Sequence, residues 1–71
     1  MSEFYYFHDT VDDKGNHEVH AESCSYIPNA YNRTMIGYER SCSDAIKRAE
    51  KEYPTKSFDG CYFCSRPCHT G

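Results

Sequence analysis

The chain has 71 residues, a net charge of −3 and only 38% hydrophobic residues. This length leaves room for one domain, over residues 1–71, with a marginal core that a disulfide framework, a metal ion or a partner must stabilise. The acidic balance argues against non-specific nucleic-acid binding, which depends on an excess of Lys and Arg, but leaves specific binding through a small basic face open.

The N-terminal segment carries no basic region followed by an apolar run, and no apolar stretch approaches the ~18 residues of a membrane span. We therefore expect a cytoplasmic protein that does not bind membranes. Cytosolic thiols stay reduced, and the five cysteines are an odd number, so metal binding is favoured over cross-linking. A secreted peptide held by disulfides is the alternative.

The first third of the chain predicts a β-hairpin. Residues 4–8 are aromatic and residues 17–20 are a short return strand, with a turn at residues 12–16 between them. Side-chain alternation along the second strand places Glu18 and His20 on one face.

A loop without periodicity, residues 21–33, precedes a third short strand at residues 34–38. A helix then begins at Ser41, the N-cap residue, with Asp44 three positions later as in a capping box, and Pro54 ends it. The apolar stripe of this helix consists of Ala45, Ile46, Ala49 and Tyr53.

The remaining residues predict no further regular structure: a loop at residues 55–60, a tight turn at residues 60–64 and a tail at residues 65–71. The expected fold class is therefore α+β, a small three-stranded sheet that includes the hairpin, with one helix, stapled by a zinc site. Because Leu, Ile and Val are scarce, aromatic rings are expected to form the core, namely Phe4, Tyr5, Tyr6, Phe7, Tyr26, Tyr31 and Tyr62.

Two closely spaced pairs carry the chemistry of the chain: His20-x3-Cys24 and Cys61-x2-Cys64. Structural zinc sites use four thiolate or imidazole ligands in a tetrahedron, and ligands two to four residues apart can point inward from one turn. We predict that Zn²⁺ joins the two pairs. Such binding contributes about 10–16 kcal/mol in zinc-finger peptides, more than the deficit of a small core.

The fourth ligand has rivals. Cys68 is the strongest, because Cys61, Cys64 and Cys68 would then come from one tail, and the others are His17, His69 and Cys42. Cys42 lies at the helix N-terminus, where a thiolate is favoured, but a small buried apolar residue under the helix is the preferred interpretation.

The sequence lacks the motifs that a catalytic function would need. A redox Cys-x2-Cys motif needs a strand before it and a helix after it, and only seven residues, including Pro67, follow Cys64. No Ser/His/Asp triad, carboxylate pair or phosphate loop is visible. We therefore expect a non-enzymatic, monomeric interaction module for a protein or nucleic-acid partner, with a thiol-based redox or alkyl-acceptor protein as the alternative.

The ligand order resembles a known family. His20-x3-Cys24, Asn32, the strand around Tyr38, Ser43-x-Ala45 at a helix start and Cys61-x2-Cys64 are similar to the Ada-type zinc module, the metal-binding domain of the Ada DNA-repair methyl acceptor. A shorter relative forms the tail of some secreted nucleases and competence proteins. The resemblance spans about residues 17–64 and implies that zinc is held by His20, Cys24, Cys61 and Cys64.

Two departures limit what the resemblance implies. Ada has a cysteine where this chain has His20, and in Ada that cysteine accepts the methyl group, so methyl transfer is not implied here. The family has a proline before its Cys-x2-Cys pair, where this chain has Gly60.

Overall fold

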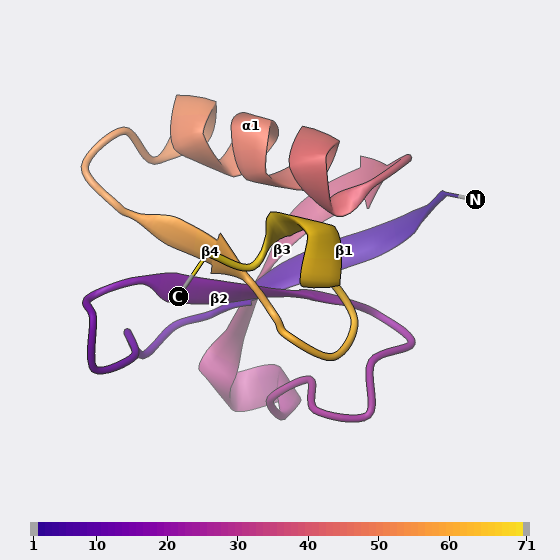
Figure 1. Ribbon diagram of the computed structural model, residues 1–71, viewed down its shortest axis with the longest axis horizontal. Coiled ribbons are helices and arrows are strands. Elements are labelled where there is room, and N and C mark those ends of the chain that lie inside the picture. The colour runs from indigo at the N-terminus through magenta and orange to yellow at the C-terminus, as the bar shows by residue number, and fades with distance from the viewer. Residues whose placement is uncertain (1, 71) are drawn as a thin grey trace.

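The computed structural model describes residues 2–70. Figure 1 shows the elements in chain order, which are β1 (Glu3–His8), β2 (His17–Ala21), the 3-10 turn η1 (Ala30–Asn32), β3 (Arg33–Glu39), α1 (Cys42–Glu52), β4 (Phe58–Gly60) and the 3-10 turn η2 (Arg66–Cys68).

A mixed four-stranded sheet in the order β3-β1-β2-β4 forms one layer, and α1 forms the other (Figure 1). β1 runs antiparallel to both β2 and β3, whereas β2 and β4 run parallel. The predicted α+β class is confirmed. Neither α1 nor the 3-10 turns of residues 2–70 combine the length and apolar character needed to cross a bilayer.

The β1–β2 hairpin is closed by the predicted turn. The Asp12 carboxylate accepts hydrogen bonds from the backbone N–H groups of Lys14 and Asn16, each at 2.9 Å. Gly15 has a φ of +82°, a conformation that costs glycine little because it has no Cβ. The hydrogen bonds that close this turn thus run between residues 12–16 themselves.

Helix α1 begins where the sequence predicts it. The Ser41 hydroxyl accepts a hydrogen bond from the backbone N–H of Asp44 at 3.2 Å, which satisfies one of the orphan donors of the first turn. The apolar stripe faces the sheet, and the core between the two layers consists of Tyr5, Phe7, Val19, Ala21, Ile36, Cys42, Ala45 and Ala49.

The predicted three-stranded sheet is wrong in one respect, because residues 58–60 form the strand β4 and not a loop. Asp59 and Gly60 are both poor strand formers, so local propensity gives no signal for this strand. It exists because of its neighbour: β4 pairs with β2 in parallel, with Glu18 opposite Asp59. A tertiary contact thus overrides a propensity that favours a loop.

The prediction that all the aromatic rings form the core is also wrong in part. Tyr5, Tyr6 and Phe7 are buried, but Tyr26 and Tyr31 are 59% and 94% exposed. Phe4 and Tyr62 are also exposed, at 37% and 41%. Tyr5, Tyr6 and Phe7 become buried in the inner strand β1, which lies between β2 and β3, whereas Tyr26 and Tyr62 lie on surface turns and Tyr31 lies in η1.

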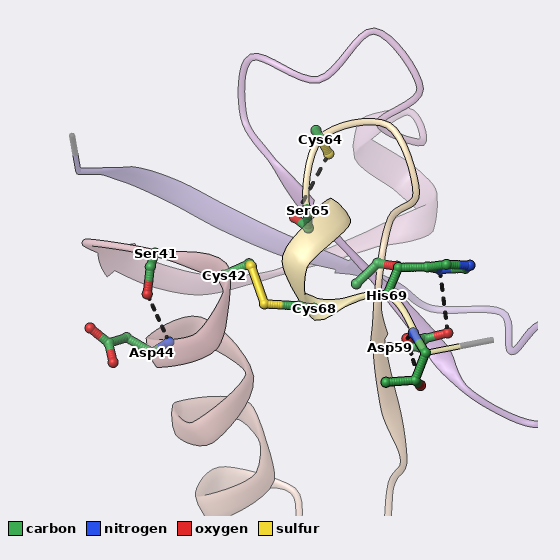
Figure 2. The surroundings of a disulfide bond; sticks show 10 residues. Ser41, Cys42, Asp44, Asp59, Cys64, Ser65, Cys68 and His69 are labelled. Atoms are coloured by element: carbon green, nitrogen blue, oxygen red, sulfur yellow. Dashed lines mark hydrogen bonds and ion pairs between the residues drawn. A yellow bond between two sulfur atoms is a disulfide. The ribbon is translucent and has the colours of Figure 1, made fainter.

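Cys42 is buried as expected, but it is not an unpaired thiol. Figure 2 shows its disulfide to Cys68, which joins the start of α1 to η2 across a sequence separation of 26 residues. The expectation of reduced, unbridged cysteines is therefore wrong for this pair. Sequence alone gave no sign of the pairing because the two residues meet only when the C-terminal turn folds back onto the helix.

Candidate metal centre

The parallel pairing of β2 and β4 determines where the four predicted ligands lie. Parallel neighbours end at the same edge of a sheet, so the turns that follow them start side by side. His20 lies near the end of β2, and Cys24 lies on the turn that follows this strand, where its N–H donates to Ala21 O. Cys61 directly follows β4, and its N–H donates to Val19 O at 2.9 Å.

The side chains of His20, Cys24, Cys61 and Cys64 form a cluster in which Cys64 is half-buried and the other three are buried. Their donor atoms, one imidazole nitrogen and three sulfurs, all lie within 4.8 Å of one another. Cys24 Sγ is 3.7 Å from His20 Nδ1 and 4.0 Å from Cys61 Sγ, and Cys64 Sγ is 4.0 Å from His20 Nδ1. These three cysteines are not in disulfides. The arrangement can hold a metal ion.

Burial shapes the chemistry of the cluster. Desolvation lowers the pKa of His20 to about 4, with a smaller contribution from His8, so this imidazole is neutral at pH 7, the form that binds metals. Desolvation raises the pKa of Cys64 to about 12 and also raises that of Cys61. A nucleophilic cysteine needs a lowered pKa, so without a cation these thiols are poor nucleophiles.

One carboxylate completes the surroundings of the cluster. Glu18 Oε1 lies 3.2 Å from His20 Nε2, the ring nitrogen that faces away from the sulfurs. Glu18 lines a surface hollow of about 370 Å³ whose walls include His20, Cys61 and the ring of Tyr26. Side-chain alternation predicted that Glu18 and His20 share one strand face, but it did not assign Glu18 to the site.

The rival ligands are all engaged elsewhere. The sulfurs of Cys42 and Cys68 are bonded to each other, and the Nδ1–H of His17 donates to His8 O at 2.8 Å. The Nδ1–H of His69 donates to Gly60 O at 2.9 Å, and Figure 2 shows this ring beside Asp59. None of the four belongs to the cluster among the described residues.

A thioredoxin-like site needs a strand before the Cys-x2-Cys pair and a helix after it, and only the strand is present within residues 2–70. The strand β4 does precede the Cys-x2-Cys pair, which the sequence did not reveal. The segment after Cys64 forms η2, a single 3-10 turn of three residues, so no helix dipole is available to stabilise a thiolate at Cys61.

The chain matches no protein-family model, no curated protein and no solved structure. The interpretation of the cluster therefore rests on its own geometry.

Proposed function

We propose that this chain is a small zinc-binding module without catalytic activity, which serves as an interaction domain. The convergence of His20, Cys24, Cys61 and Cys64 carries the proposal. A tetrahedron with Zn–S bonds of about 2.3 Å and a Zn–N bond of about 2.0 Å has edges of roughly 3.5–3.8 Å. Three of the separations between the donor atoms are 3.7–4.0 Å, close to those edges, and none exceeds 4.8 Å, so a contraction around the ion closes the difference.

The donor chemistry supports zinc over other common ions. Three sulfurs and one imidazole suit a borderline-soft cation in four-coordinate geometry, whereas Ca²⁺ and Mg²⁺ require oxygen ligands and higher coordination numbers. All four positions are filled by protein side chains, as in structural zinc sites, so no open position is left for a catalytic water.

Metal content measured by elemental analysis and native mass spectrometry tests this proposal. We expect one zinc per chain, lost in the single variants Cys24→Ala and Cys61→Ala. The double variant Cys42→Ala/Cys68→Ala is the matched control, because it removes two cysteines outside the cluster and should keep full zinc. A wild-type chain that binds no zinc, or a control that loses it, contradicts the proposal.

Cobalt substitution examines the ligand set directly. Co²⁺ in place of zinc is expected to give the intense visible bands of a tetrahedral site and the near-ultraviolet sulfur-to-metal bands of three thiolates. His20→Cys should strengthen the sulfur bands while the metal stays bound. Unchanged sulfur bands in that variant would show that His20 is not a ligand.

A surface for a partner lies beside the cluster. Tyr26 and Phe63 stack with their ring centroids 4.1 Å apart, Tyr62 lies next to Phe63, and the Arg66 guanidinium lies over Tyr62. Aromatic residues and Arg are enriched at protein interfaces. Because the whole chain carries a net charge of −3, a protein partner is favoured over a nucleic acid.

Kinship with the Ada-type module is part of the proposal and rests on the order and spacing of the four ligands. A cytoplasmic location stays a prediction from the sequence. The Cys42–Cys68 disulfide argues against it, because cytosolic thiols are usually kept reduced.

A further inference from the structure

We infer that Glu18 is a positioning residue of the metal centre, which orients His20 through a hydrogen bond from the ring nitrogen that the metal does not use. This inference rests on the proposed metal binding. Its basis is the placement of the two ring nitrogens, because Nδ1 faces the sulfurs of Cys24 and Cys64 and Nε2 faces the carboxylate of Glu18.

An imidazole ring can bind a metal through only one nitrogen in its neutral form, and that nitrogen must be free of its proton. The carboxylate lies 3.2 Å from Nε2, within reach of its proton, and accepting the Nε2–H would favour the tautomer that leaves the Nδ1 lone pair directed at the cluster. The hydrogen bond also increases the basicity of the ring and restricts its rotation. Such partners of metal-bound histidines change metal affinity by about 10- to 100-fold.

The backbone of β2 brings the side chains of Glu18 and His20 together. Glu18 and His20 are two residues apart on β2, so both side chains lie on the same face of the strand. The parallel neighbour β4 holds this strand in register, with Glu18 opposite Asp59. The contact therefore needs no flexible loop to form.

The solvent exposure of Glu18 makes a clean experiment possible. Its side chain is 38% exposed, against 2% for that of His20, and it lines the surface hollow instead of the core. Removing it leaves no buried cavity, so Glu18→Ala should fold normally. Glu50→Ala is the matched control, since Glu50 is an exposed glutamate on α1, on the far side of the core.

Zinc affinity is to be measured by competition with a chromophoric chelator. We expect Glu18→Ala to bind zinc about 10- to 100-fold more weakly than wild type, and Glu50→Ala to match wild type. Glu18→Gln keeps an acceptor oxygen without the charge and should recover part of the loss. Equal affinity of Glu18→Ala and wild type would overturn the inference.

Nitrogen-15 NMR of the imidazole rings in the chain supplied with zinc gives a second readout, independent of the affinity measurement. The Nε2 proton of His20 should be observable in wild type, protected from exchange by its bond to Glu18, and should exchange faster in Glu18→Ala. A His20 ring protonated on Nδ1 in wild type would also overturn the inference. A wild-type chain that shows the Nε2 proton but binds no zinc would contradict the proposed function and leave the Glu18–His20 contact intact.

Discussion

Gly60 occupies a position at which no side chain fits. A Cβ placed there would lie 2.6 Å from Ser65 O, 2.7 Å from Cys68 Cβ and 2.8 Å from Cys68 C. Two of these atoms are backbone and the third belongs to a disulfide-bonded residue, so none can move away cheaply. This close packing excludes any residue with a Cβ, proline included, from this position.

We therefore expect Gly60→Ala to destabilise the protein by about 1–3 kcal/mol, as overpacking in a rigid environment usually does. Urea unfolding of the zinc-loaded protein, followed by circular dichroism, measures this change. A loss below about 0.5 kcal/mol, the range of neutral surface substitutions, would show that the C-terminal turn yields easily.

Individual contacts differ in how far the sequence predicts them. Alternation placed Glu18 and His20 on one strand face, and the structure adds that their polar atoms lie 3.2 Å apart. Cys42 and Cys68 gave no comparable signal, because a disulfide depends on the positions of two Cα atoms, here 6.3 Å apart, that only the complete fold determines.

Helix α1 is the element that the sequence predicts best, since its determinants are local. Ser41, the apolar stripe and Pro54 all act within a few residues, and the helix spans Cys42–Glu52 as a result. The strand β4 is the opposite case, because its three residues become a strand only by pairing with β2.

The N-cap of α1 gives a test at this scale. Ser41→Ala removes the acceptor of the Asp44 N–H and should cost about 1 kcal/mol of stability. Ser43→Ala is the control, because Ser43 is an exposed residue in the first turn of the same helix and does not cap it. Urea unfolding of both variants is the measurement, and equal stabilities would contradict the assigned cap.

For the whole molecule, the disulfide and the metal centre are two separate restraints on one short chain. The disulfide attaches η2 to α1, and the metal cluster attaches the turn after β4 to the turn after β2. Closing a loop across 26 residues stabilises by about 3–4 kcal/mol in the chain-entropy model. The binding energy of structural zinc in finger peptides is about 10–16 kcal/mol.

These magnitudes predict that bound zinc stabilises the fold more than the disulfide does. Cys42→Ala/Cys68→Ala should remain folded in zinc with its stability lowered by about 3 kcal/mol. Removal of zinc from the wild-type chain by a strong chelator should instead unfold it. Thermal unfolding under both conditions is the measurement. A metal-free chain that melts like the loaded one would mean that the core and the disulfide suffice.

At this scale the α+β class follows from the sequence, but the strand order does not. Hairpins and helices are encoded by neighbouring residues, whereas the position of β4 depends on a pairing between segments about forty residues apart (His17 opposite Phe58). The same pairing brings the two ligand pairs together. The sequence thus named four residues that the structure brings together but did not reveal the strand pairing responsible.

The common direction of β2 and β4 has a consequence for protein engineering. The four ligands come from two adjacent strand ends and the turns that follow them, and residues 25–57 between these turns supply β3 and α1 but no ligand of the cluster. A designer can therefore transplant the two turns onto another pair of parallel strands, and the same four donor atoms should then meet there.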